Sequence, residues 1–403
     1  MLEQVHINTI RKYFPDIEYI FQLGNLINYT QQNLYKNSVN PIPRKAVTYY
    51  ANPTLGGKRY QQFTIQKKNG EERTITAPVP TLNLLQACIK TMLAALYIPK
   101  PCVTGFVNGK SIVDNARVHV GQNYVYNIDI KDFFPSIHFR RVKTVLQLSP
   151  FNLKEKIAFM VANIACYQGV LPQGAPTSPI LSNVICQRLD RRLTGLAKRF
   201  GCKYTRYADD ITFSSMHNAY HSQSAFIKEL HRIVKNENFT LNTRKTRLQH
   251  RNYRQEVTGL LVNEKVNVNK RYIRTIRAIL HNWETKGLDK AADIFRDHYQ
   301  KDRGNVKKKF SDIRNVIAGK LEYLAMVRGK NDALVQKYTQ QFTRLMLHQN
   351  HKIPYRIDIK KVLETWETSG IEKAIALFYN EHTFYSGKSK TEHDLDVIHC
   401  YMS

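Results

Sequence analysis

The sequence predicts an α+β protein, with an antiparallel sheet and helices in its first two thirds and helices alone after them. Three patterns carry this prediction. Apolar or aromatic residues alternate with polar ones on both sides of Asp209-Asp210, which indicates two strands joined at the acidic pair. A similar alternation over residues 60–78 indicates a hairpin. From Arg271 onward, apolar residues recur with helical spacing in a strongly basic segment.

The composition indicates a folded protein with a polyanionic partner. Of the 403 residues, 42% are apolar and 11% are aromatic, and the formal net charge is +29. Such a charge favours either nucleic acid or an anionic membrane surface as the partner. The longest apolar run, Met92 to Ile98, is far shorter than the roughly 20 residues of a membrane-spanning helix. The sequence therefore favours nucleic acid and no membrane.

The cysteines and the first residues predict a cytoplasmic protein. Residues 1–10 lack the basic-then-apolar pattern of a signal peptide. The six cysteines never fall in a C-x-x-C pair, which disfavours both a zinc site and a disulfide framework. We expect them to be small buried hydrophobic residues in a reducing compartment.

The first predicted hairpin, over residues 60–78, turns at Asn69-Gly70, a pair that tolerates positive φ angles. Three cations, Lys67, Lys68 and Arg73, surround that turn. Considered alone, these charges are explained equally well by a solvated turn and by a binding site.

Helical spacing predicts a core-facing helix over residues 82–97. The segment Gly105 to Gly121 begins as a loop, and its middle predicts a short helix with Asn115 and His119 on one face. On physical grounds alone, such a pair is more often a structural hydrogen bond than a functional site.

A strand over residues 124–130 ends in Asp129. An isolated buried carboxylate at that place is costly unless it is paired or bound to a metal. The elements expected after it are helices over 139–170, a Pro- and Gly-rich loop at 171–179, helices over 180–200 and 222–236, and a second β segment at 257–263.

Asp129 and the pair Asp209-Asp210 would bring carboxylates from separate strands to one place. Mg²⁺ prefers oxygen ligands and is usually held by one or two carboxylates together with substrate phosphates. Two such ions, about 3.5–4 Å apart, can activate an attacking 3′-oxygen and stabilise a leaving pyrophosphate. An Asp-Asp pair alone is a weak signal, because one arises about once by chance in a chain of this length. The three acids together predict a two-metal site.

The chain resembles the reverse transcriptases over roughly residues 55–330. In the order of that family it carries Asp129-x-x-x-Phe133-Phe134, the loop Leu171-Pro172-Gln173-Gly174, the run Tyr207-Ala208-Asp209-Asp210, the segment of Lys245 and a hairpin at Gly259. The resemblance implies a right-hand polymerase. Its fingers and palm would combine an antiparallel sheet with helices, and a helical thumb would be followed by a C-terminal helical extension.

The resemblance also implies roles for single residues. The catalytic and metal-holding carboxylates would be Asp129, Asp209 and Asp210. The backbone carbonyl of Ile130 would be a further ligand of two Mg²⁺ ions, which Mn²⁺ can replace. Phe134 falls at the steric-gate position, which favours dNTPs, and Lys245 falls where a pyrophosphate-protonating lysine is proposed. The full set expected to contact the incoming nucleotide is Lys67, Lys68, Arg73, Phe134, Gln173 and Lys245.

Two shorter motifs resemble the bacterial retron reverse transcriptases. Asn115-Ala116-x-x-His119 matches their N-A-x-x-H signature, and Val257-Thr258-Gly259 matches their V-T-G signature. The resemblance implies a cognate structured noncoding RNA of the msr-msd type. Part of it would be copied, from the 2′-hydroxyl of an internal guanosine, into branched RNA-linked DNA (msDNA). It also implies an effector protein and a role in antiphage defence.

The residues expected to contact this RNA come from both motifs and from the basic helical third. A solvated charged face is the alternative for the basic cluster. The full set is Asn115, His119, Val257, Thr258, Gly259, Lys307, Lys308 and Lys309.

We expect four parts along the chain: an N-terminal region with the fingers (1–120), a palm with interspersed fingers helices (121–270), a helical thumb (271–350) and a C-terminal helical extension (351–403). The extension repeats the first thumb helices, because residues 279–291 recur as 362–374 with the two tryptophans at equivalent positions. We predict a duplicated helix–turn–helix in which a glycine ends each first helix. The resemblance assigns the extension no role.

Three other functions compete with this interpretation. The first is another class of reverse transcriptase, either of the group II intron type or a non-retron defence polymerase. The second is an RNA-dependent RNA polymerase, which Phe134 disfavours. The third is a catalytically inactive RNA-binding protein on a polymerase fold, which the three carboxylates disfavour. Primer extension with labelled dNTPs and NTPs distinguishes these classes.

Overall fold

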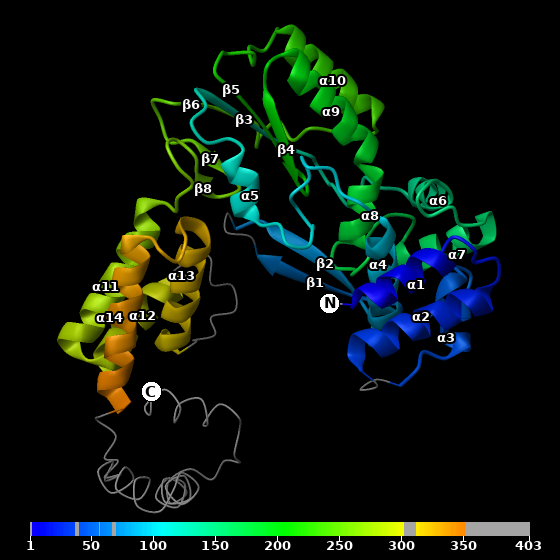
Figure 1. Cartoon of the computed structure of the whole chain (residues 1–403), viewed down its shortest axis with the longest axis horizontal. Helices are drawn as coiled ribbons and strands as arrows, with labels where there is room; N and C mark the ends of the chain where they lie inside the picture. The colour runs from blue at the N-terminus through cyan, green and yellow to red at the C-terminus, as the bar shows by residue number, and fades with distance from the viewer. Residues whose placement is uncertain (1, 37–39, 56, 67–69, 302–311, 351–403) are drawn as a thin grey trace, which may run out of the picture. The chain divides into compact units, whose positions relative to one another are not determined.

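Within the described residues, a four-stranded antiparallel sheet carries the predicted acidic residues; we call it the central sheet (Figure 1). The structure is a computed structural model that describes residues 2–36, 40–55, 57–66, 70–301 and 312–350. The strand order is β4-β5-β3-β6. The strands span β3 Tyr124–Asp129, β4 Lys203–Tyr207, β5 Asp210–Ser215 and β6 Arg247–His250.

The two faces of the central sheet meet different partners. Residues directly opposite each other on antiparallel strands share a face, so Tyr204 and Phe213 lie together on one face and Tyr207 and Asp210 on the other. Helices α9 (Gln187–Arg199) and α10 (Ala225–Asn236) pack over the first, where the rings of Phe213 and Phe226 meet edge to face at 5.1 Å. We call this the covered face, and we call the other, which carries Asp210, the cleft face.

A second pair of strands lies before the central sheet in sequence. β1 (Tyr60–Gln66) and β2 (Glu72–Pro78) form the predicted antiparallel hairpin. The amide of Thr76 on β2 donates to the carbonyl of Gln173 at 2.8 Å, which fastens the hairpin to the Pro- and Gly-rich loop. Gly174 has φ +126°, and a Cβ there would come within 2.9 Å of Ile75, so this contact requires glycine.

The N-terminal helices pack around a long apolar helix. α4 (Pro80–Leu96) begins with a proline at its first position, which suits a helix start, and it contacts α1, α2 and α7. Buried residues such as Ile10, Phe14 and Leu23 fill the space between these helices. The helices before it span α1 Gln4–Tyr13, α2 Ile20–Tyr35 and α3 Arg44–Ala51.

Short helices connect the strands of the central sheet. Ser111 and Asp114 form a capping box that starts α5 (Ile112–Arg117), because each side chain accepts from a backbone amide of the first turn. The other connecting helices span α6 Phe139–Gln147, α7 Glu155–Ala165 and α8 Ser178–Ile185.

A small hairpin and a group of helices follow the central sheet. Asn269 caps α11 by accepting from the amide of Tyr272, and Gly287 ends that helix at φ +82°. The glycine therefore has the predicted role in the first copy of the repeat, whereas the second copy lies outside the described residues. The elements span β7 Glu256–Val257, β8 Leu260–Leu261, α11 Lys270–Lys286, α12 Leu288–Lys301, α13 Ile313–Arg328 and α14 Ala333–Asn350.

The chain divides into two compact units, Met1–Tyr338 and Thr339–Ser403. The central sheet, the β1–β2 hairpin and the helices up to α13 all belong to the first. The predicted boundaries at residues 120, 270 and 350 stay predictions. No helix among the described residues is both long and apolar enough to cross a membrane.

The α+β class is confirmed, and so are the predicted hairpins and the strand that ends at Asp129. Some details differ. The segment 139–170 contains two helices with Pro150 between them, because a proline removes a helical hydrogen bond. Helices α1 to α3 and the edge strand β6 were not predicted, since their sequences lack a clear period.

Candidate active site

The three predicted carboxylates lie at one edge of the central sheet. Asp129 ends β3 and is the register partner of Asp210, which begins β5, so both side chains lie on the cleft face. Asp209 occupies the turn between β4 and β5, and its carbonyl accepts from the amide of Ile130 at 3.1 Å. Residues about 80 positions apart are thus held together by backbone pairing, as the predicted two-metal site requires.

The turn that carries Asp209 has an unusual backbone. Ala208 is buried with φ +57°, in the left-handed region that residues with a Cβ rarely occupy. Gly105 packs directly on it, since a Cβ at Gly105 would come within 2.3 Å of the Ala208 amide nitrogen. The close approach requires glycine at 105, and it confines the backbone immediately before Asp209.

Two of the carboxyl groups, those of Asp209 and Asp210, have raised pKa values. Burial, followed by the negative charges of Asp209 and Asp129, raises the pKa of Asp210 to about 6. Burial and the charge of Asp129 also raise the pKa of Asp209, although Lys245 and Arg73 act in the opposite direction. Raised carboxyl pKa values mean that the ionised group lacks sufficient positive charge around it.

Lys245 supplies part of the missing positive charge. Its Nζ lies 2.8 Å from Oδ2 of Asp129, and the Asn242 side-chain amide donates to Oδ1 at 3.2 Å. The backbone amide of Asn242 also donates to the Asp129 carbonyl at 2.8 Å, which places the whole 242–245 segment beside β3. The Lys245 side chain stays 57% exposed, so it can move when another cation or a phosphate arrives.

The donor set suits a divalent cation by its chemistry. Among the described residues, no three His, Cys, Asp or Glu side chains are already gathered around one point as a metal site. Carboxylates are nevertheless the hard oxygen ligands that Mg²⁺ prefers, and bound cations would offset the burial and the repulsion that together raise the pKa values of Asp209 and Asp210. Ile130 directly follows Asp129, and its amide donates to the carbonyl of Asp209.

The predicted nucleotide contacts approach from the β1–β2 hairpin and the loop bonded to it. Arg73 is exposed on β2, and its charge reaches Asp209, where it opposes part of the net rise in the pKa of that group. Gln173 is half-buried and anchored through its carbonyl to Thr76. Lys67 and Lys68 lie outside the described residues.

Phe134 is half-buried, and its ring meets Phe133 with centroids 5.3 Å apart. On its other side lies Phe106, which is 44% exposed, at 6.1 Å between centroids. Phe106 and Gly105 belong to the loop that packs on the Ala208 turn. The predicted gate residue and the catalytic turn therefore share one supporting loop.

A cleft of about 560 Å³ is lined by Asp129, Asp210 and Lys245 and by several residues that sequence reasoning missed. Arg244 and Arg247 add positive charge, and Tyr207 and Ile112 add part of the wall. A cluster of cations near Lys245 is visible in the sequence, but nothing there indicates which side of β6 faces the acids. The full lining is Ile112, Asn127, Ile128, Asp129, Tyr207, Asp210, Arg244, Lys245, Thr246, Arg247, Thr258 and Gly259.

The N-A-x-x-H motif is internal, which corrects the prediction that Asn115 and His119 contact RNA. Both side chains have no exposed surface. The two ring nitrogens of His119 lie 2.7 Å from the hydroxyls of Ser214 and Thr205, so the ring joins β5 to β4. Burial lowers the pKa of His119 to about 3, which keeps the imidazole neutral.

The V-T-G motif is divided between core and cleft. Val257 has no exposed surface, so the prediction that its side chain contacts RNA is corrected as well. Thr258 and Gly259, with φ +47° and +83°, form the β7–β8 turn and line the cleft. The Asn115 amide lies 3.5 Å from the Thr258 hydroxyl, so the two motifs support each other. Lys307, Lys308 and Lys309 lie outside the described residues.

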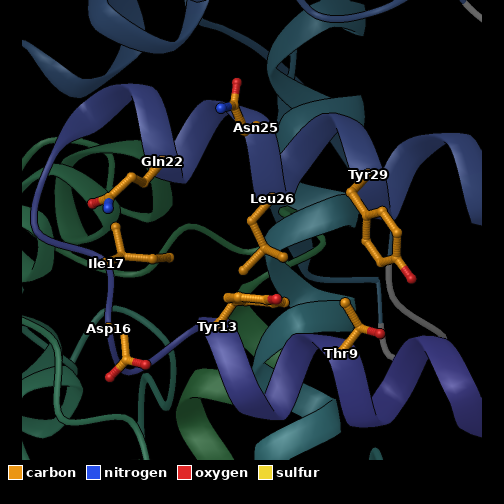
Figure 2. A pocket seen from close by; sticks show the side chains of 8 residues that line it. All are labelled: Thr9, Tyr13, Asp16, Ile17, Gln22, Asn25, Leu26 and Tyr29. Carbon is orange, nitrogen blue, oxygen red and sulfur yellow. The ribbon is translucent and has the colours of Figure 1, made fainter.

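Another pocket, of about 410 Å³, lies between α1 and α2. Figure 2 shows its side chains, with Tyr13 and Thr9 projecting from α1 toward Leu26 and Tyr29 of α2. It contains no residue predicted for catalysis or nucleic-acid binding, and its lining is mostly apolar. The chemistry therefore belongs to the cleft at the central sheet.

Comparison with known proteins agrees with this geometry. Residues 65–286, more than half of the chain, match the family described as Reverse transcriptase (RNA-dependent DNA polymerase). The retron Ec86 reverse transcriptase of Escherichia coli is 36% identical over 230 residues, which cover 56% of this chain and 70% of that protein. The retron Mx162 and Mx65 reverse transcriptases of Myxococcus xanthus are also 36% identical, over 253 and 240 residues.

The match to Mx162 covers 55% of this chain and 52% of that protein, and the match to Mx65 covers 56% of each. The chain thus spans about half the length of these two relatives. Among solved structures, a telomerase of Candida albicans aligns with 86% of this chain and 71% of its own, at 10% identity and a TM-score of 0.41, too low for a structural argument. On the family match and the retron relatives, the chain belongs to the reverse transcriptase family, in the group of bacterial retron reverse transcriptases.

Proposed function

We propose that this chain is a retron-type RNA-directed DNA polymerase that copies part of a cognate structured noncoding RNA into branched RNA-linked single-stranded DNA. The observation that carries the proposal is the placement of Asp129, Asp209 and Asp210 at one edge of the central sheet, where the pKa values of Asp209 and Asp210 are raised and cations approach from several segments. The family match and the retron relatives support the same activity.

Reverse transcriptases generally use divalent metal ions, and here we propose two Mg²⁺, with Mn²⁺ as a substitute. When bound, such ions lower the pKa of the primer hydroxyl and neutralise the charge of the departing pyrophosphate. The three carboxylates and the Ile130 carbonyl would hold them. Lys245 would move from Asp129 toward the phosphates, because its exposed side chain is long enough to change partners.

The incoming dNTP would lie between the acids and the β1–β2 hairpin. Arg73 would pair with the triphosphate, since its charge already reaches Asp209, and Gln173 would contact the nucleotide from its anchored loop. Lys67 or Lys68 would add a second cation. Phe134 would pack against the sugar and reject a 2′-hydroxyl by collision.

The net charge of +29 supports a large RNA partner, since a basic protein gains affinity by releasing counterions from phosphates. Thr258 and Gly259 at the cleft wall, and Lys307, Lys308 and Lys309, are the proposed contacts. We further propose a nearby-encoded effector protein, a role in antiphage defence and a cytoplasmic location. The cysteines within the described residues are all free, as a reducing compartment would leave them.

The proposal is tested by primer extension on an RNA template with Mg²⁺ and either labelled dNTPs or labelled NTPs. Extension with dNTPs and much weaker extension with NTPs is expected. Extension with NTPs alone would identify an RNA polymerase, and RNA binding without extension would identify an inactive relative.

The retron part of the proposal needs a second measurement. Nucleic acid that copurifies with the chain from cells carrying the neighbouring DNA is digested with ribonuclease, and then with an enzyme that cleaves 2′–5′ branches. A DNA whose mobility changes with ribonuclease and changes again after debranching is expected. Linear DNA, or none, from an enzyme active in primer extension would favour another class of reverse transcriptase.

A further inference from the structure

Arg206 has a fully buried side chain immediately behind the catalytic turn. It belongs to β4 and points to the covered face, where Nε and Nη2 each donate to one oxygen of Asp190 at 2.8 Å. Its Nη1 donates to the Asn183 side chain at 3.1 Å and to the Ala208 carbonyl at 3.0 Å. A single guanidinium therefore joins α8 and α9 to the residue that precedes Asp209.

The partner carboxylate is equally enclosed. Asp190 has no exposed surface, and the Tyr204 hydroxyl also donates to it at 2.8 Å. Removing one member of such a pair is costly, but replacing both with apolar residues of similar volume is often neutral or stabilising. Fold stability alone thus gives little reason for an ion pair at this place.

The backbone of Arg206 holds the loop that packs on the same turn. Its amide donates to the Cys102 carbonyl at 2.8 Å, and its carbonyl accepts from the amide and hydroxyl of Thr104 at 3.0 and 3.2 Å. Gly105 follows that loop and contacts the Ala208 amide. The Ala208 carbonyl therefore accepts a hydrogen bond from the Arg206 side chain, and Gly105 packs against the Ala208 amide.

We infer that Arg206 is a positioning residue, which holds Ala208 in its left-handed conformation and thereby fixes where the Asp209 carboxylate lies relative to Asp129. A free turn with alanine at this position would favour a negative φ, and repulsion between the carboxylates would drive Asp209 outward. Only a planar fork with several donors can reach Asp190 and Ala208 together, whereas a lysine offers one point charge. The inference rests on the proposed function of the cleft.

Two variants test the inference. Arg206→Lys keeps the charge beside Asp190 but cannot hold both partners. The triple variant Arg206→Met/Asp190→Leu/Tyr204→Phe removes the whole polar group and leaves no buried charge without a partner. Arg192→Met is the matched control, because Arg192 lies on the same helix α9 and pairs with Glu237 at 2.7 Å, away from the turn.

Thermal melting, Mn²⁺ binding followed by electron paramagnetic resonance without nucleotide, and primer-extension kinetics are measured for each variant. We expect the triple variant to melt close to the wild type yet to bind Mn²⁺ more weakly. Its kcat should fall by about tenfold to a hundredfold, as small misplacements of reacting groups do. The KM for the template should change little, and Arg206→Lys should fall between. Arg192→Met should match the wild type in Mn²⁺ affinity and kcat, whatever its effect on the melting temperature.

If the folded variants keep the wild-type Mn²⁺ affinity and kcat, the polar group of Arg206, Asp190 and Tyr204 is an ordinary part of the core, and the inference is wrong. Loss of folding in both Arg206 variants would overturn it too, since the role would then be one of stability. If the wild type binds Mn²⁺ but synthesises no DNA, the proposed function fails, while the difference in Mn²⁺ affinity still decides the positioning role.

Discussion

The two faces of the central sheet both carry charged groups, and they balance these charges in opposite ways. On the covered face, Arg206 and Asp190 neutralise each other without any exposed surface. On the cleft face, Lys245 acts on Asp129, Asp209 and Asp210, while Arg73 acts on Asp209 and Arg247 on Asp210. The charges of the covered face are neutralised within the protein. The cleft face has too little positive charge of its own, and a bound ligand can supply the rest.

This difference indicates how the fold can support an unfavourable site. Carboxylates that repel one another store free energy that bound cations can release, provided that the surrounding backbone does not yield first. The paired charges and the aromatic contacts of the covered face keep the backbone from moving in response to this repulsion. Changes to the carboxylates should therefore affect ligands and catalysis most, while changes to the buried groups that support them should affect geometry or stability.

The largest expected effect comes from Asp209→Asn on the cleft face. Losing one anionic ligand should reduce dNTP incorporation by more than about a hundredfold, the scale of removing one electrostatic contact to a transition state. The melting temperature should stay equal or rise, because one of three repelling charges is gone. Primer extension and thermal melting are measured together, and wild-type incorporation by the folded variant would contradict the assignment of the site.

The second prediction concerns His119→Ala, whose effect should fall on stability. Two buried hydroxyls, on Thr205 and Ser214, lose their partner, at about 1–3 kcal/mol for each unsatisfied group. Chemical denaturation should show this loss. A variant as stable as the wild type would mean that the ring is not the link between β4 and β5.

The same residue predicts a pH dependence. The pKa of His119 is about 3 in the fold and 6.5 in the unfolded chain, so only the unfolded chain takes up the proton between these values. Its contribution should lower stability as pH falls below about 6.5, by up to about 1.4 kcal/mol per pH unit. Denaturation of the wild type and of His119→Gln at several pH values measures this, and equal slopes would contradict it.

Much of the cleft face could be predicted from sequence because its signals are local. Strand alternation on both sides of Asp209-Asp210, and an apolar strand that ends at Asp129, are visible within ten residues each. The resemblance to reverse transcriptases then assigned these segments to motifs that follow one another in the order of that family. The N-A-x-x-H motif was located correctly but given the wrong role, because a signature does not reveal whether its side chains point inward.

The covered face could not be predicted, because its central pair depends on tertiary packing. Asp190 lies in the segment Arg188-Leu189-Asp190-Arg191, which looks like an ordinary charged helix surface. Arg206 resembles any polar residue of a half-exposed strand. Only the packing of α9 on β4 brings them together. The sequence period shows which residues share a face of the helix or of the strand, but it does not show how the helix is rotated against the strand.

The fourth prediction uses the raised pKa of Asp210, about 6 in the fold against 3.8 in the unfolded chain. Protonation competes with metal, so Mn²⁺ affinity should fall roughly tenfold between pH 7 and 5. The effect on the stability of the metal-free protein has the opposite sign to that of His119, since the folded state takes up the proton first. Asp210→Asn should bind Mn²⁺ weakly at both pH values, and an equally steep fall in that variant would assign the titration to another group.

The smallest effect is expected for Phe134, whose ring lies beside the loop of Gly105 and Phe106. Phe134→Ala should raise NTP use relative to dNTP use by on the order of tenfold, because the ring that would meet a 2′-hydroxyl is removed. Phe106→Ala removes only the neighbouring ring and should change the ratio less. Competing incorporation of a single dNTP and the matching NTP measures both. If Phe106→Ala also lowers kcat with dNTPs, the loop at Gly105 transmits its loss to the Ala208 turn. If neither variant changes the ratio, Phe134 is ordinary core and sugar selection lies elsewhere in the cleft.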